Sequence, residues 1–315
     1  VEDDLRRVEE LLLGQVTSEI GEILEISRYM FHGGGKRFRP LLHLLSTRLC
    51  GYLGEERYRI AASLECVHTA TLLHDDVIDN AYLRRGRASA NAVWGNRRSV
   101  LAGDFLFATA VLWILGTENS KIQSLFAQTC ARMAEGEAYQ HSRARNPNQT
   151  EADYFKVVSQ KTAGLISLAC QSGAIIASAP EEMENALARF GREIGKAYQI
   201  VDDTLDYTSE TKELGKTMGK DLEEGKVTLP LIHAISEASS IEVEIIRKVI
   251  TEEAKDDEDL QRVVALIKKY KGIDYAYERA QELVKKAKDA LDILPKSPLK
   301  DSLLATADFT VERSR

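Results

Sequence analysis

Apolar residues recur at helical spacing along almost the whole chain. This pattern predicts helices over residues 2–30, 57–79, 98–115, 119–143, 150–178 and 181–208, with further helical runs from residue 227 onward. The breaks fall at glycine, proline and polar clusters, such as the run from Gly33 to Gly35, which cannot stay helical without a large entropic cost. Thr150 is expected to cap the helix that follows it. The predicted fold class is therefore all-α.

Composition changes this picture little. The chain has 315 residues, 44% of them hydrophobic, and no Pro/Gly/Ser-rich linker divides it, so we expect residues 1–315 to form a single large domain with a sizeable core. The net charge of -7 argues against general nucleic-acid binding. No charged-then-apolar leader opens the sequence, and charges interrupt its most apolar segments, so we expect a cytoplasmic protein without stable membrane insertion. The four cysteines show no metal-site spacing and are expected to be reduced, buried thiols: Cys50, Cys66, Cys130 and Cys170.

The motif D-D-x-x-D occurs twice, each time after an apolar run and near the end of a long predicted helix. One copy is Asp75, Asp76 and Asp79, and the other is Asp202, Asp203 and Asp206. On a helix the first and last aspartates of each copy are four apart and share a face, where like charges repel. Two such patches indicate that cations lie between them.

Magnesium suits these sparse carboxylates, because it typically binds through one or two of them together with substrate phosphates. The sequence therefore predicts a diphosphate held by a shared magnesium cluster, with basic side chains supplying further positive charge. Basic residues do follow each motif and the triple glycine, although the protein is acidic overall: Lys36, Arg37, Arg39, Arg84, Arg85, Lys216, Lys220 and Lys226. A further base, Lys161, lies in the middle of the chain.

These motifs, taken in order, resemble the trans-isoprenyl diphosphate synthases over nearly the whole chain. The segment from Gly34 to Pro40 is similar to the family's G-G-K-x-x-R-P, and His68 lies seven residues before Asp75. The resemblance implies an isopentenyl diphosphate site made by Lys36, Arg39, His68 and Arg85. It implies allylic and catalytic roles for both aspartate motifs and for Arg84, Lys161, Thr162, Gln199, Lys216 and Lys226, with Asp221 joining the six aspartates around the metal.

The same resemblance implies an isoprenoid synthase bundle around a central elongated cavity, about three Mg²⁺ ions, and a homodimer. The implied substrates are isopentenyl diphosphate and an allylic primer, farnesyl or geranylgeranyl diphosphate. The implied reaction is ionisation, condensation and elimination, in which the released diphosphate takes the final proton. The hydrophobic product is expected to pass to a membrane.

Product length is predicted from the helix that carries Asp75. Positions one turn below it are small, Ala70 and Thr71, where short-chain relatives often place a bulky aromatic residue, and Val67, Leu64 and Ile60 follow on successive turns. A deep tunnel and a long, octaprenyl-like product for quinone side chains are therefore expected. Trp113, Met133 and Tyr139 are candidates for its end. The alternative is a short-chain farnesyl or geranylgeranyl diphosphate synthase.

Other classes explain the pattern less well. A single D-D-x-x-D is usually solvated helix surface, but two copies with following bases are not. A class I terpene cyclase would not need Lys36, Arg39 and His68. A non-catalytic subunit of a heteromeric synthase should have lost one aspartate motif. A di-iron bundle needs Glu-x-x-His, whereas Glu137 is followed by His141 four residues later.

Overall fold

The computed structural model describes residues 1–208, 219–252 and 256–312, and these form helices joined by short connections and a single two-stranded ribbon. The chain divides into two compact units. Unit 1 contains Val1–Gln128, Leu168–Ala188 and Lys296–Leu303, and unit 2 contains Thr129–Ser167, Arg189–Pro295 and Leu304–Arg315. The all-α prediction is confirmed. The prediction that residues 1–315 form one domain stays a prediction.

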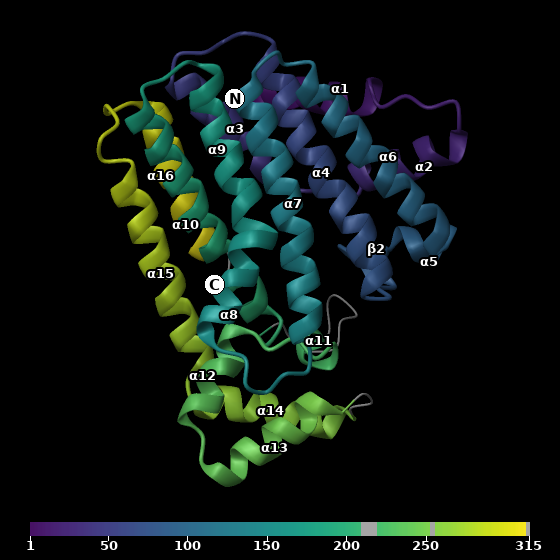
Figure 1. Cartoon of the computed structure of the whole chain (residues 1–315). Helices are drawn as coiled ribbons and strands as arrows, with labels where there is room; N and C mark the ends of the chain where they lie inside the picture. Colours follow the sequence, from purple (N-terminus) through teal and green to yellow (C-terminus); the bar gives the residue numbers. More distant parts are fainter. Residues whose placement is uncertain (209–218, 253–255, 313–315) are drawn as a thin grey trace. The chain divides into compact units, whose positions relative to one another are not determined.

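Unit 1 is organised around a central helix, α4 (Glu56–Ile78), which packs along α6 (Asn96–Leu115), as Figure 1 shows. Every residue from 60 to 67 of α4 is buried, as expected for a core helix rather than an amphipathic surface helix. A short antiparallel ribbon pairs Leu83 with Ala88 just after α4. The other elements wholly within unit 1 are α1 (Glu2–Gly14), α2 (Gly21–His32), α3 (Phe38–Leu49), β1 (Leu83–Arg84), β2 (Arg87–Ala88) and α5 (Ala90–Trp94).

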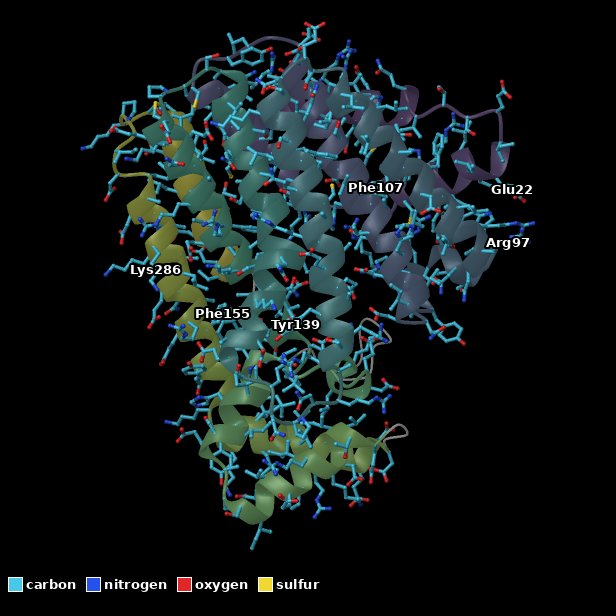
Figure 2. The ribbon with its side chains drawn as sticks, viewed as in Figure 1. Glu22, Arg97, Phe107, Tyr139, Phe155 and Lys286 are labelled. Carbon is cyan, nitrogen blue, oxygen red and sulfur yellow. The ribbon has the colours of Figure 1, made fainter. Side chains whose placement is uncertain are left out.

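Helix α2 meets the start of α6 within unit 1. Glu22, which Figure 2 labels, makes an ion pair with Arg98 near the start of α6, over 3.2 Å. Tyr29 of α2 packs edge-on against Trp94, with ring centroids 5.0 Å apart, and its hydroxyl donates to the Ala88 carbonyl over 2.7 Å. These contacts hold the ribbon beside α2.

Unit 2 contains a buried core that includes Tyr207, Leu222, Val227 and Ile246. The helices wholly within this unit are α8 (Glu151–Val158), α11 (Lys220–Glu223), α12 (Leu229–Glu237), α13 (Ser240–Thr251), α14 (Asp257–Lys269) and α15 (Gly272–Ala290), and a π-helical turn, η1 (Ser159–Ala163), follows α8. The unit boundary falls inside α7 (Ser120–Arg143), α9 (Gly164–Ile176), α10 (Glu181–Leu205) and α16 (Pro298–Glu312).

Three local predictions can be compared with these elements. Thr150 does cap α8, because its hydroxyl accepts a hydrogen bond from the Asp153 amide over 3.1 Å while the Asp153 carboxylate accepts the Thr150 amide. The helix predicted over 150–178 is instead α8, the π turn and α9, since a π turn widens one turn without interrupting the apolar pattern. The basic segment 83–87, whose glycine and charges predict a loop after the first aspartate motif, forms the ribbon of β1 and β2.

Helix α6 is long and apolar enough, by length and composition, to cross a membrane. The same is true of many core helices in soluble proteins, and 39% of its most apolar window is buried. One side carries exposed apolar side chains, with Leu112 68% and Leu115 55% exposed. The expected absence of stable membrane insertion stays a prediction.

Candidate active site

The first aspartate motif ends α4. Asp75 and Asp76 lie in its last turn, and Asp79 is the C-cap residue, whose amide donates to the Asp75 carbonyl over 2.8 Å. Asp76 is fully buried, and its Oδ1 accepts hydrogen bonds from the Arg84 guanidinium, one of them 2.9 Å long from Nε. Its other oxygen, Oδ2, is buried with no hydrogen-bond partner among the described residues. A buried carboxylate oxygen of this kind is suited to a hard cation.

A basic pocket lies next to this motif in unit 1. Its lining includes two of the predicted isopentenyl diphosphate residues, His68 and Arg85, and the complete lining is Tyr29, Met30, Gly33, Arg37, Glu65, His68, Thr69, Leu72, Arg84, Arg85, Arg87, Ala88 and Ser89. A Cβ at Gly35 would lie 2.9 Å from Arg85 Nη1, so this glycine allows the exposed Lys36 segment to approach the ribbon.

The electrostatics of this pocket favour an anion. The pKa of His68 lies well below its usual value, first because the ring is buried and then because Arg39 and Arg85 repel its charged form. His68 is therefore neutral near pH 7 and can donate a hydrogen bond without contributing charge. The predicted residues His68, Arg39 and Arg85 thus share one positive environment.

Four charged or aromatic residues of this pocket received no site role from the sequence, although Arg37 was named among the bases that follow the triple glycine. Tyr29 and Arg87 form a cation–π contact, with the guanidinium carbon 4.3 Å from the ring centroid. Arg37 adopts a left-handed backbone conformation with φ of 44° and makes an ion pair with Glu65. A signal existed for the arginines, because Arg37 stands between two assigned bases and Arg87 ends the basic segment. Nothing in the sequence marked Tyr29 or Glu65.

The second aspartate motif closes α10 in unit 2. Asp202 is exposed and Asp203 is buried, while Asp206 lies just beyond the last helical residue. The Asp206 carboxylate accepts the Asp221 amide over 2.9 Å, so the predicted metal residue Asp221 does lie beside the motif.

Burial, and then the crowding of these carboxylates, raises the pKa values of Asp203 and Asp221. Burial, with Asp202 nearby, raises the pKa of Asp203 to about 7, and burial together with Asp203 and Asp206 raises that of Asp221. A bound cation would relieve this repulsion. Within the part of the chain that the structure describes, no three His, Cys, Asp or Glu residues are close enough to hold a metal alone. The donor set fits Mg²⁺ shared with substrate phosphates, which needs only one or two carboxylates.

A second pocket brings together six of the predicted catalytic and metal residues of unit 2, whereas Asp202 and Asp206 are not in its lining among the described residues. Lys161, Thr162, Gln199, Asp203, Asp221 and Lys226 all line it, together with Gln140, Ala144, Gln149, Tyr154, Val157, Val158, Val227 and Thr228. Lys161 donates to Gln140 over 3.1 Å and pairs with Glu137, and Lys226 pairs with Glu224 over 2.6 Å. The predicted residue Lys216 lies outside the described residues.

Lys161 and Thr162 lie on the π turn, a feature often found at functional sites. Two glycines allow neighbouring helices to touch it. A Cβ at Gly136 of α7 would lie 2.8 Å from Gln160 Cβ, and one at Gly195 of α10 would lie 2.7 Å from Ala163 Cα. The turn is therefore held on both sides.

The predicted chain-length residues lie along α4. Val67 and Ala70 are buried, and half-buried Thr71 donates its hydroxyl to the His68 carbonyl over 2.8 Å. Of the candidates for the tunnel end, Tyr139 (labelled in Figure 2) donates its hydroxyl to Asp153 at the start of α8. The roles of all these residues stay predictions.

An all-α fold with two aspartate-rich motifs, each beside a polar pocket, is that of a prenyltransferase of the isoprenoid synthase type. The chain belongs to the polyprenyl synthetase family, whose model matches residues 21–267.

Several relatives are similar to this chain over nearly its full length and theirs. The octaprenyl diphosphate synthase of Haemophilus influenzae is 42% identical over 311 residues, covering 99% of this chain and 94% of the relative. A crystal structure of decaprenyl diphosphate synthase from Rhodobacter capsulatus has a TM-score of 0.95 at 40% identity, covering 100% and 97% of the two chains. A polyprenyl synthase from Caulobacter crescentus, solved with calcium and isoprenyl diphosphate, has a TM-score of 0.95 at 37% identity, covering 100% and 95%.

Proposed function

We propose that this enzyme condenses isopentenyl diphosphate head to tail with an allylic diphosphate, giving a long-chain all-trans polyprenyl diphosphate of about octaprenyl length. The single observation that carries the proposal is the grouping of bases and acids into two pockets. His68, Arg37 and Arg85 line one, whereas Lys161, Asp203 and Lys226 line the other. Two separate polar pockets suit a reaction between two diphosphates. The octaprenyl and decaprenyl relatives support the long product.

The pocket of unit 1 is assigned to isopentenyl diphosphate. Arginine binds phosphate oxygens with its planar fork, so Arg85 and Arg87 hold the diphosphate, while neutral His68 donates a hydrogen bond. Arg37, whose two Nη atoms contact Glu65 and the Phe31 carbonyl, adds positive charge beside them. Tyr29 holds Arg87 in place through its ring. The substrate is thereby fixed with its double bond free to attack, which lowers the entropic part of the barrier.

The pocket of unit 2 is assigned to the allylic substrate. Bound Mg²⁺ would neutralise the allylic diphosphate and assist its departure. Lys226 adds positive charge where negative charge develops on the leaving group, and the Thr162 oxygen, held by Gln199, faces the allylic cation. No protein general base is assigned, because the released diphosphate can accept the final proton. The Caulobacter crescentus relative was solved with calcium and isoprenyl diphosphate, which supports a role for a divalent ion in this enzyme.

We also propose that the enzyme is a homodimer that associates through α6. One side of this helix exposes Val100, Leu101, Phe107, Leu112 and Leu115. A contiguous apolar stripe on a globular protein usually marks an interaction surface. A second copy of the chain can cover it symmetrically, since in a twofold interface the same patch meets itself.

A cytoplasmic location is proposed as well. It is supported by the four unpaired cysteines, of which Cys66 and Cys170 are buried. Burial raises the pKa of Cys50 to about 11, so its thiol stays protonated and unreactive. Fractionation of cells that express the protein, with and without carbonate washing of the membranes, tests this location.

The test of function is incubation of the purified chain with Mg²⁺, farnesyl diphosphate and labelled isopentenyl diphosphate, followed by product chromatography. A long polyprenyl diphosphate is expected, and EDTA should abolish its formation. Products that stop at farnesyl or geranylgeranyl length would favour the short-chain alternative. Activity that appears only after a partner chain is added would instead favour a heteromeric subunit.

A further inference from the structure

Tyr154 is a residue of the second pocket to which neither the aspartate motifs nor their flanking bases assign a role. It belongs to α8, and only 4% of it is exposed. Its hydroxyl donates to Asp203 Oδ2 over 2.6 Å. A buried carboxylate needs such donors because it has lost its hydration. This contact joins α8 to the second aspartate motif.

The contact with Tyr154 begins a line of hydrogen bonds through the pocket. The second oxygen of Asp203, Oδ1, accepts from Gln199 Nε2 over 2.7 Å. The Gln199 carbonyl, Oε1, in turn accepts from the Thr162 hydroxyl over 2.8 Å. Four side chains from α8, the π turn and α10 are therefore connected in sequence, and each of them lines the pocket.

The direction of each bond follows from the chemistry of its partners. In its ionised form Asp203 can only accept, so the Tyr154 hydroxyl donates to Oδ2 and the Gln199 amide turns its NH₂ group toward Oδ1. The Gln199 carbonyl then faces Thr162, whose only hydroxyl hydrogen is used in this bond. The Thr162 oxygen therefore has lone pairs, and no hydrogen, to present to the rest of the pocket. Lone pairs attract a cation, whereas a hydroxyl hydrogen would repel it.

We propose that Tyr154 is a positioning residue for the prenyl transfer reaction. By holding Asp203 it fixes the orientation of the Gln199 amide, and so keeps the lone pairs of Thr162 available to the allylic cation. This inference rests on the proposed function, because it needs an allylic cation in this pocket. Tyr154 acts through Asp203 and Gln199 and does not itself touch the reacting carbons.

A simpler role for Tyr154 is to fill space and satisfy a buried carboxylate. The two roles differ in what happens when Thr162 is already disabled. If Tyr154 acts through Thr162, removing the Tyr154 hydroxyl should not lower the rate constant any further in a Thr162→Val background. If it only supports the local structure, the two losses should multiply. A double-mutant cycle measures this difference.

The cycle compares wild type, Tyr154→Phe, Thr162→Val and the double variant in single-turnover assays with Mg²⁺, farnesyl diphosphate and labelled isopentenyl diphosphate. Tyr154→Phe should lower the single-turnover rate constant at least tenfold. In steady-state assays it should change KM for isopentenyl diphosphate less than twofold. The double variant should be no slower than Thr162→Val alone. Multiplicative losses, or an unchanged rate in Tyr154→Phe, would overturn the proposal.

Tyr275→Phe is the matched control. Its hydroxyl donates to another carboxylate of unit 2, Glu151, over 2.6 Å, but neither residue lines the pocket. This variant should retain the wild-type rate. If Tyr154→Phe does not fold, 3-fluorotyrosine incorporated at position 154 keeps the hydroxyl and makes it a stronger donor. 3-Fluorotyrosine at position 154 should change the rate constant relative to wild type, and 3-fluorotyrosine at position 275 should not. Equal rate constants for these two variants would contradict the proposal.

Failure of this inference is distinguishable from failure of the proposed function. If wild-type protein elongates farnesyl diphosphate but Tyr154→Phe does so equally well, the positioning role is wrong and the function stands. If wild-type protein makes no polyprenyl product, the proposed function is wrong, and with it the inference.

Discussion

Arg37 Nη1 donates to Glu65 Oε1 over 2.8 Å, and both side chains are almost removed from solvent, with exposed fractions of 11% and 4%. Arg37 also donates to the Phe31 carbonyl over 2.7 Å. The pair thus ties the backbone segment that carries Lys36 to α2 and α4. Among the described residues, Glu65 is also the one acidic residue in the lining of the pocket of unit 1, beside four arginines.

Replacing Glu65 with Gln should weaken isopentenyl diphosphate binding, because Arg37 loses the charge that holds it. We expect KM for isopentenyl diphosphate to rise about tenfold, corresponding to about 1.4 kcal/mol, with KM for the allylic substrate unchanged. Removing one partner of a buried ion pair should also cost stability. Steady-state kinetics with each substrate varied in turn measure both constants. Glu9→Gln is the control and should leave KM unchanged. Glu9 also pairs with Arg37, but over a longer distance of 3.4 Å and at a half-exposed position where solvent screens its charge.

The contacts of Glu65 and Tyr154 show where sequence reasoning reaches its limit. The aspartate motifs and the bases near them could be predicted, because their spacing within one helix or loop fixes their relative positions. Glu65 and Arg37 are 28 residues apart, and Tyr154 and Asp203 are 49 apart, so only the packing of different helices brings each pair together. The π turn also escaped prediction, since its apolar pattern reads as ordinary helix.

Close packing of Gly195 against the π turn predicts a catalytic defect in Gly195→Ala. The added methyl group would lie 2.7 Å from Ala163 Cα and 2.9 Å from its Cβ, so the turn that carries Thr162 must move. Overpacking of this kind costs about 1–3 kcal/mol, and we expect kcat to fall at least tenfold. Gly21→Ala is the control, because nothing lies within 4 Å of the Cβ that it adds. Equal kcat values for both variants would refute the positioning role of this contact.

Bulky residues along α4 should shorten the product in a graded way. Ala70 is five residues before Asp75, and Leu64 is eleven before it, about 9 Å further along the helix at 1.5 Å per residue. Ala70→Tyr should give farnesyl-like products, and Leu64→Phe should give longer ones that still fall short of wild type. Both positions are 1% exposed, so thermal unfolding must confirm that each variant is folded. An unchanged chain-length distribution in folded Ala70→Tyr would rule out a tunnel along this helix.

Burial of His43 predicts that the protein loses stability in weak acid. The ring is fully buried, with Nδ1 2.9 Å from Ser172 Oγ, and burial lowers its pKa to about 4. The unfolded chain takes up this proton near pH 6.5 and the folded chain only near pH 4, so protonation favours unfolding between these values. This group alone should reduce the free energy of unfolding by about 3 kcal/mol from pH 7 to pH 4.

Urea unfolding of wild type and His43→Gln at several pH values isolates this effect from other titrating groups. Glutamine cannot take up a proton, so the stability difference between the two proteins should shrink as the pH falls from 6.5 to 4. A difference that stays constant over this range would show that His43 is not held neutral by burial.

The apolar stripe on α6 predicts that one charged substitution separates the proposed dimer. Leu112 is 68% exposed in a single chain, and burying a leucine side chain is worth about 1.5–3 kcal/mol; a twofold interface loses this contribution twice. Leu112→Glu should therefore sediment as a monomer at concentrations where wild type is a dimer. Leu53→Glu should remain dimeric, because Leu53 is equally exposed, at 66%, but lies outside α6. Should wild type instead sediment as a monomer and float with lipid vesicles in a Leu112-dependent way, the stripe would be a membrane-binding surface and the dimer proposal would be wrong.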